Sequence, residues 1–179
     1  MKRFSLAVFV ALLPLLFAPV AYAKGVKADV YFGYSRVGAN LYQPNTPGIN
    51  GWQFAAHIKP MPFAGIEGDV SHFSQTLSGA SQQVTLYMFG PRVTVHAAGV
   101  SLFAHGLAGI AHDHATVTIY PPVGYDAVSY ALGGGADLPL FLGLKLRGTA
   151  DYLGNSKAPS SGSPSPSHYR FGVGVAYHF

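Results

Sequence analysis

The sequence predicts an all-β fold, an eight-stranded antiparallel up-and-down transmembrane β-barrel. The clearest observation is the segment from Ser167 to Phe179, which alternates without a break between apolar or aromatic residues and small or charged ones. Successive side chains of a strand point to opposite faces, so one face of this segment is wholly apolar. A strand that lies between lipid and a polar lumen is expected to show this pattern.

A second observation concerns the way in which the chain can cross a membrane. After residue 23, no apolar run reaches the roughly 18 residues that a helical span needs. A crossing by strands requires a closed barrel, because an open sheet leaves unpaired backbone groups in lipid. The chain contains 22 Gly and 13 Pro but no Cys, so no disulfide is expected to hold it together.

The N-terminus has the features of a secretory signal peptide. Lys2 and Arg3 precede an apolar run over residues 4–20, and Ala21-Tyr22-Ala23 supplies the small residues of a cleavage site. We therefore predict a signal peptide over residues 1–23 and one barrel domain over residues 24–179. An uncleaved membrane anchor is the alternative, and the prolines within the apolar run disfavour it.

The first four predicted strands share one alternation of apolar outward and polar inward side chains. They span residues 28–37, 51–59, 64–73 and 83–95. The outward residues are Val30, Phe32, Tyr34, Trp52, Phe54, Ala56, Ile58, Ile66, Val70, Tyr87, Phe89, Val93 and Val95. The inward residues are Gln53, His57, Lys59, Glu67, Asp69, Ser71 and Arg92.

The last four predicted strands span residues 100–111, 127–138, 142–152 and 167–179. The fifth strand is small and apolar on both faces, so the pattern assigns it no orientation. The outward residues of the other three are Val128, Tyr130, Leu132, Leu138, Leu142, Leu144, Leu146, Ala150, Tyr152, Tyr169, Phe171, Val173, Val175, Tyr177 and Phe179. Their inward charged residues are Asp137, Lys145, Arg147, Asp151 and Arg170.

The connections between the predicted strands alternate in length. Short links follow strands two, four and six, whereas longer polar loops follow strands one, three, five and seven. The loops after strands three, five and seven cover residues 74–82, 112–126 and 154–166. Outer-membrane barrels have short periplasmic turns and longer outer loops, with both termini in the periplasm.

The inward charges predict an ion-pair network inside the barrel. An eight-stranded barrel is just wide enough for its interior to be filled by side chains, and buried charges must be paired. The expected members are Glu67, Asp69, Arg92, Asp137, Lys145, Arg147, Asp151 and Arg170. The network is interpreted as a structural plug, and a gated ion path or a catalytic carboxylate pair are the alternatives.

Two short motifs are weighed as chemical sites and rejected. His112-Asp113-His114 places two imidazoles on one strand face, but a metal normally needs three or four ligands, so a solvated loop is preferred. His72-Phe73-Ser74 is similar to the His and Ser pair of outer-membrane lipid A deacylases. Gln75 replaces the Asn of that family, so an interfacial strand end is preferred. No catalytic residue, metal site or cofactor is predicted.

Several segments resemble the small outer-membrane barrels, the family of OmpA transmembrane domains and opacity-type proteins. The segments are Tyr87-Met88-Phe89-Gly90-Pro91-Arg92, Ala131-Leu132-Gly133-Gly134-Gly135-Ala136-Asp137, Ala150-Asp151-Tyr152 and the last strand to Phe179. The resemblance implies that the barrel-assembly machinery recognises the last strand, through Tyr169, Phe171, Val173, Val175, Tyr177 and Phe179. It also implies a place in the outer membrane of a Gram-negative-type cell.

The expected role is structural or interactive, with the long loops as contact sites for a surface ligand that the sequence does not identify. The expected partners are outer-membrane lipid and the assembly machinery. Loss of Lys2 and Arg3 with the signal peptide lowers the formal net charge from +4 to +2, which is too small and too scattered for nucleic-acid binding. Three alternatives remain: a narrow ion channel, a lipid-modifying enzyme with His72 and Ser74, and a soluble lipocalin-like barrel.

Overall fold

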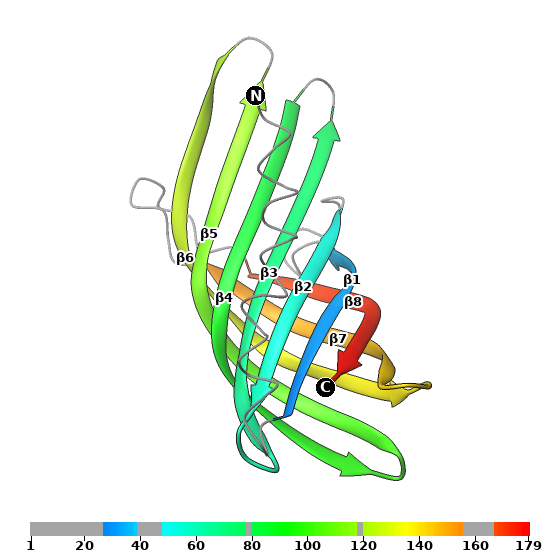
Figure 1. Ribbon diagram of the computed structural model, residues 1–179. Coiled ribbons are helices and arrows are strands. Elements are labelled where there is room, and N and C mark those ends of the chain that lie inside the picture. Colours follow the sequence, from blue (N-terminus) through cyan, green and yellow to red (C-terminus); the bar gives the residue numbers. More distant parts are fainter. Residues whose placement is uncertain (1–26, 39–47, 78–79, 118–119, 156–166) are drawn as a thin grey trace, which may run out of the picture.

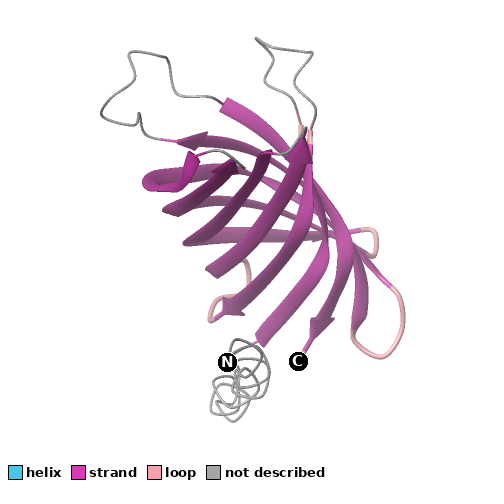
Figure 2. Ribbon diagram, turned by 90° about the horizontal axis from the view of Figure 1, so that it is seen from above, coloured by secondary structure: helices cyan, strands magenta, loops and turns pink. Residues whose placement is uncertain are grey.

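Eight antiparallel strands form the protein in a computed structural model, which describes residues 27–38, 48–77, 80–117, 120–155 and 167–179. The strands curve around a common axis and enclose a lumen (Figures 1 and 2). They are β1 (Lys27–Val37), β2 (Ile49–Lys59), β3 (Ala64–Leu77), β4 (Ala80–Ala97), β5 (Val100–Val117), β6 (Tyr120–Pro139), β7 (Leu144–Asn155) and β8 (Ser167–His178).

Each strand pairs with its sequence neighbours, and β8 pairs with β1 to close the barrel. The closing register places Phe32 opposite Val175 and Val37 opposite Arg170. Closure satisfies the backbone groups that an open sheet would expose at its two edges. The predicted fold class is therefore confirmed. Among the described residues no helix is long and apolar enough to cross a membrane, a finding that has no bearing on strands.

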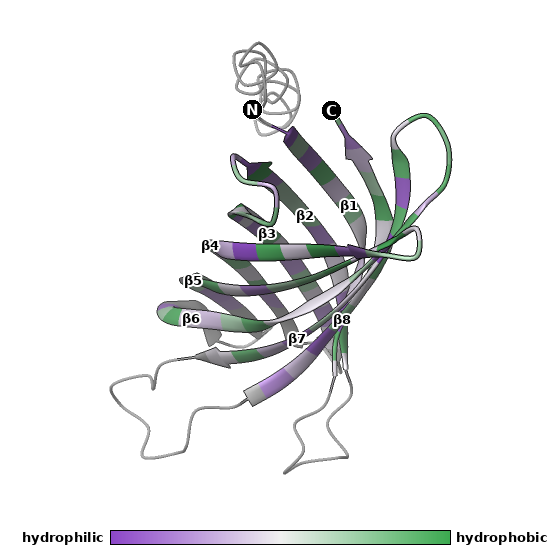
Figure 3. Cartoon of the chain, turned by 90° about the horizontal axis from the view of Figure 1, so that it is seen from below, coloured by the Kyte–Doolittle hydropathy of each residue, from purple (hydrophilic) through white to green (hydrophobic). Residues whose placement is uncertain are grey.

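The side chains of the barrel wall alternate between an apolar exterior and a polar interior. Phe89 is 70% exposed and Ile66 is 62% exposed, whereas Arg170 is fully buried. The hydropathy colouring shows this alternation along the strands (Figure 3). A soluble barrel would bury the apolar side chains and expose the charged ones. The arrangement excludes the lipocalin-like alternative and is that of a barrel whose outer wall meets lipid.

Two predicted loops are replaced by strands. Strands β4, β5 and β6 have 18, 18 and 20 residues, whereas β1 and β2 have 11 each. The extra length covers most of residues 74–82 and 112–126, and Figure 1 shows these strands rising beyond the rest of the barrel. The prediction was wrong because a polar composition indicates only that a segment contacts water. A strand that projects into water can still pair with its neighbour through backbone hydrogen bonds. The predicted loop at 154–166 lies mostly outside the described residues.

The opposite end of the barrel carries the short turns. Ala98 and Gly99 have φ angles of 49° and 81°, and Leu142 and Gly143 have φ angles of 51° and 81°. Ala98 and Gly99 form a two-residue link between β4 and β5, whereas Leu142 and Gly143 end a link of four residues between β6 and β7. Two consecutive positive φ angles match the twist of a tight hairpin turn, for which glycine is favoured. Leu142, predicted as the first outward residue of a strand, therefore lies in a turn, and β7 begins at Leu144.

The interior of the barrel has a polar and an apolar part. An apolar cluster lies farther from the short turns than the buried charges do, and it contains Phe73, Leu86, Met88, Leu107, Ala111, Ala131 and Leu153. The sequence pattern left the orientation of residues 100–111 open. The structure places Ser101, Phe103, His105 and Leu107 inside and Leu102 and Ile110 outside.

Candidate functional site: a lumen ion-pair network and a basic vestibule

All eight strands contribute to one buried network of polar and charged side chains. Its charged members are Asp29 of β1, His57 of β2, Glu67 and Asp69 of β3, Arg92 of β4, His105 of β5, Asp137 of β6, Arg147 and Asp151 of β7 and Arg170 of β8. Since every strand is represented, the network ties opposite walls of the barrel together.

Arg170 forms the link between the last strand and the third. Its Nη1 donates to Asp69 Oδ1 at 2.8 Å and to Ser71 Oγ at 2.6 Å, and its Nε donates to Asp151 Oδ2 at 2.8 Å. Gln53 donates to the second oxygen of Asp69 at 2.5 Å. Asp69 is therefore held by side chains of β2 and β8, and Ser71 of its own strand also donates to it, which satisfies a carboxylate that has no access to water.

His105 bridges two carboxylates on opposite walls. Its Nε2 lies 2.8 Å from Asp151 Oδ1, and its Nδ1 lies 2.9 Å from Glu67 Oε1. The second distance is an ion-pair contact without the alignment of a good hydrogen bond. Arg92 donates to the other oxygen of Glu67 at 2.6 Å. His105 thus connects the contacts of Arg92 with those of Arg170.

Arg147 organises the part of the network nearest the short turns. Its Nε donates to Asp137 Oδ1 at 2.6 Å, and its Nη2 donates to Asp29 Oδ1 at 2.7 Å. The second oxygen of Asp29 lies 3.0 Å from His57 Nδ1. Arg92 reaches Asp137 at 3.5 Å and so joins this group to Glu67.

An aromatic ring packs between two of the guanidinium groups. The Cζ of Arg92 lies 3.7 Å from the centroid of the Phe103 ring, and the Cζ of Arg147 lies 5.0 Å from it. Tyr31 contacts Arg147 from another side, at 5.4 Å. These cation–π contacts stabilise charges that have been removed from water.

The buried carboxylates of the network are all paired with guanidinium groups. The network contains five carboxylates and three guanidinium groups, and each carboxylate contacts at least one guanidinium group. His57 adds a contact to Asp29, and His105 adds contacts to Glu67 and Asp151. This pairing is expected because an unpaired buried charge is strongly disfavoured.

The structure brings together seven of the eight charged residues that the sequence placed in the lumen. The exception is Lys145, which is half-buried at the mouth of the barrel and makes no ion pair among the described residues. The predicted network did not include Asp29, His57 and His105, although His57 was predicted to point inward. Asp29 has the inward parity of its strand, whereas His105 lies on the strand whose faces look alike in sequence.

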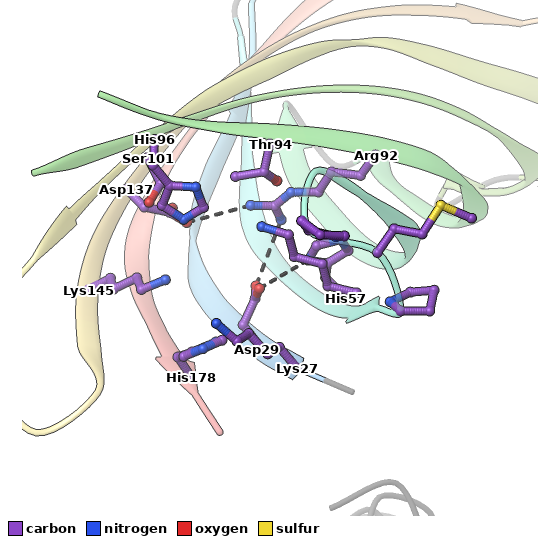
Figure 4. A pocket seen from close by; sticks show the side chains of 14 residues that line it. Lys27, Asp29, His57, Arg92, Thr94, His96, Ser101, Asp137, Lys145 and His178 are labelled. Atoms are coloured by element: carbon purple, nitrogen blue, oxygen red, sulfur yellow. Dashed lines mark hydrogen bonds and ion pairs between the residues drawn. The ribbon is translucent and has the colours of Figure 1, made fainter. Parts of the chain in front are cut away.

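A cavity of about 570 Å³ opens at the end of the barrel that carries the short turns, and we call it the basic vestibule (Figure 4). Asp29, His57, Arg92 and Asp137 of the network line its inner part. Its remaining lining residues are Lys27, Lys59, Pro60, Met61, Pro62, Thr94, His96, Ser101, Lys145 and His178.

The histidines of the two motifs lie on β3 and β5 and point away from the lumen. His72 Nδ1 lies 2.9 Å from Thr85 Oγ1, and its ring lies beside Trp52. His112 belongs to β5 rather than to the predicted loop, and it contacts Asp126 and the edge of the Tyr87 ring. Within the described part of the chain no three His, Cys, Asp or Glu side chains are grouped as metal ligands would be.

Aromatic side chains are exposed near both ends of the barrel wall. Trp52, Tyr87 and Tyr130 are 41%, 50% and 44% exposed. The ring centroids of Tyr152 and Tyr169 lie 5.7 Å apart, and those of Tyr177 and Phe179 lie 5.0 Å apart at the other end of β8. Such rings mark the two interfaces between hydrocarbon and water.

The comparisons with known proteins find the same fold at low sequence identity. No family model and no curated protein matches the sequence. Neisserial surface protein A shares 8% identity at a TM-score of 0.65, over 87% of this chain and 98% of that one. The attachment invasion locus protein Ail of Yersinia pestis shares 16% identity at a TM-score of 0.57, over 86% and 97%. The N-terminal barrel domain of Pseudomonas aeruginosa OprF shares 15% identity at 0.52, over 87% and 98%.

Proposed function

We propose that this chain is an integral outer-membrane barrel with a structural and surface-contact role. The observation that carries the proposal is the inverted polarity of the wall, with exposed Phe32, Ile66 and Phe89 around fully buried arginines. The solved barrels of the same fold include a neisserial surface protein and the outer membrane protein OprG of Pseudomonas aeruginosa, which supports this location. The signal peptide over residues 1–23 supplies the export route that the location requires.

The interior is proposed to act as a plug that stabilises the barrel. The ion pairs of Arg92, Arg147 and Arg170 cross the lumen, and the apolar cluster around Phe73 and Leu107 fills the part beyond them. A small barrel filled by side chains leaves no continuous water path.

The contact surface is proposed to be the projecting ends of β3 to β6. The predicted long loops are here replaced in part by paired strands, which offer a rigid surface in place of a mobile one. His112, His114 and Asp126 are exposed there. The charges are few, so capture of a partner by strong electrostatic steering is not expected.

The last strand is proposed to be the part that the barrel-assembly machinery recognises. One face of β8, extended by Phe179 directly after it, is exposed. Its residues are Tyr169, Phe171, Val173, Val175, Tyr177 and Phe179. The backbone N–H of Phe179 donates to Ala28 O at 2.9 Å, so this face is continuous with that of β1. Changing Phe179 to Ser should lower the amount of folded protein in outer-membrane fractions.

Gel mobility tests the architecture directly. A folded membrane barrel resists detergent until it is boiled, so unheated and boiled samples should migrate differently. Fractionation should recover the protein with outer membranes. Identical mobility together with recovery from the soluble periplasm would overturn the proposal.

A narrow ion channel is the second candidate, and the water-accessible basic vestibule favours it. Planar bilayers distinguish the two candidates. The plug predicts silent bilayers for the unmodified protein, whereas a channel predicts discrete conductance steps that Arg92→Ala or Glu67→Ala changes. A lipid-modifying enzyme is disfavoured because His72 contacts Thr85 rather than Ser74. An unchanged acyl pattern of lipid A in cells without the gene would remove that candidate.

A further inference from the structure

The lysines of the described chain are gathered at one place. Lys27, Lys59 and Lys145 are the three lysines among the described residues, and all of them line the basic vestibule. They come from the beginning of β1, the end of β2 and the beginning of β7. Figure 4 labels Lys27 and Lys145. No carboxylate of the described residues lies within ion-pair distance of any of them.

The carboxylates of the vestibule are already paired with arginines. Asp29 contacts Arg147 and His57, and Asp137 contacts Arg147 and Arg92. Within the described part of the chain, the three lysines therefore have no carboxylate as an ion-pair partner. Cations that converge on a cavity with low-dielectric walls raise the local concentration of anions.

Neutral hydrogen-bond donors complete the lining. Thr94 is 7% exposed, and its hydroxyl group has no hydrogen-bond partner among the described residues. Ser101, His96 and His178 lie in the same cavity. Hydroxyl and imidazole N–H groups donate to oxyanions, and lysine ammonium groups bind phosphate as point charges.

We propose that the basic vestibule binds a small multivalent oxyanion of the phosphate class. Three ammonium groups on separate strands match an anion that carries more than one charge and several acceptor oxygens. The volume of about 570 Å³ accommodates inorganic phosphate, pyrophosphate or a small phosphomonoester. The site lies at the end of the barrel that carries the short turns, and in outer-membrane barrels that end faces the periplasm.

Isothermal titration calorimetry on the barrel refolded in nanodiscs tests this proposal. The probes are inorganic phosphate, pyrophosphate, glucose 1-phosphate and, as a carboxylate control, succinate. The triple variant Lys27→Gln/Lys59→Gln/Lys145→Gln should bind pyrophosphate at least tenfold more weakly. Arg36→Gln is the matched control, because Arg36 is an exposed cation at the opposite end of β1 and should leave the affinity unchanged.

Each result supports or overturns the site. Tighter binding of glucose 1-phosphate than of inorganic phosphate supports an organic phosphate, and the reverse supports the inorganic ion. Absent binding, equal binding of succinate, or an equal loss in Arg36→Gln would overturn the proposal. Heat-dependent gel mobility verifies that each variant is folded. A failure to bind the anion is therefore distinguishable from a failure of the barrel assignment. If the triple variant does not fold, Lys145→Gln alone should still weaken binding.

Discussion

Arg170 on the last strand and Asp69 on the third strand form a buried ion pair across the lumen, with Nη1 2.8 Å from Oδ1. The two residues are 101 positions apart in the chain. Neither lies on a strand that pairs with the strand of the other. Their contact therefore depends on closure of the whole barrel, and it reports closure more directly than any single pair of adjacent strands.

Replacing Arg170 with Met should destabilise the barrel strongly. The change leaves Asp69 and Asp151 without their guanidinium partner in a site that excludes water, which costs about 3–5 kcal/mol. Urea unfolding in lipid vesicles measures the loss. Arg36→Met removes an exposed cation and should change the free energy of unfolding by less than about 0.5 kcal/mol. Similar values for the two variants would contradict the structural role of Arg170.

Phe103 should couple energetically to Arg92. Phe103→Leu keeps an apolar side chain but removes the ring that faces the Arg92 guanidinium at 3.7 Å. A double-mutant cycle with Arg92→Met should give a coupling energy of about 0.5–2 kcal/mol. Additive effects of the two changes would show that the ring acts only as filler.

Two glycines of neighbouring strands should respond differently to one added methyl group. A Cβ at Gly133 would collide with Asp151 Oδ1 and the backbone of Ala150, whereas a Cβ at Gly148 would meet nothing within 4 Å. Gly133→Ala should therefore cost about 1–3 kcal/mol of unfolding free energy, as overpacking does, and Gly148→Ala should be nearly neutral. Equal effects of the two variants would contradict the close contact at Gly133.

Replacing Leu142 with glycine should stabilise the barrel. Its φ angle of 51° is unfavourable for a residue with a branched side chain, and the side chain is 86% exposed. Leu142→Gly should raise the unfolding free energy by about 0.5–1 kcal/mol because the strain in the turn is relieved. Leu140→Gly, at a position without a positive φ angle, should lower it. A lower unfolding free energy in both variants would contradict the prediction. It would mean that the exposed Leu142 side chain stabilises the protein by more than the strain at its φ angle destabilises it.

The alternation of β7 and β8 is sufficient to predict that Arg147, Asp151 and Arg170 point inward, since the facing of a side chain is a local property of the strand. The same rule fails for β5, because small apolar residues occupy both faces of that strand. The alternation therefore does not show that Phe103 and His105 point inward. The polar composition of residues 74–82 and 112–126 predicts loops, whereas most of these residues belong to projecting strands. Composition does not separate the two cases, because a polar strand in water and a polar loop contain similar residues.

The depth of a charged residue along the barrel axis is decided by the tertiary structure. Lys145 and Arg147 have the same parity, yet Arg147 makes the ion pairs and Lys145 lies in the vestibule. Strand tilt and register set this depth, and both depend on partners from distant parts of the chain.

The strand content, the closed-barrel class and the two faces of the clean strands follow from the order of the amino acids alone, because the local geometry of the backbone imposes a period of two. Only the folded barrel decided which charges meet, where the apolar cluster lies and how the lysines surround one cavity. Those arrangements arise from pairing between strands that are far apart in sequence, and no local pattern records that pairing.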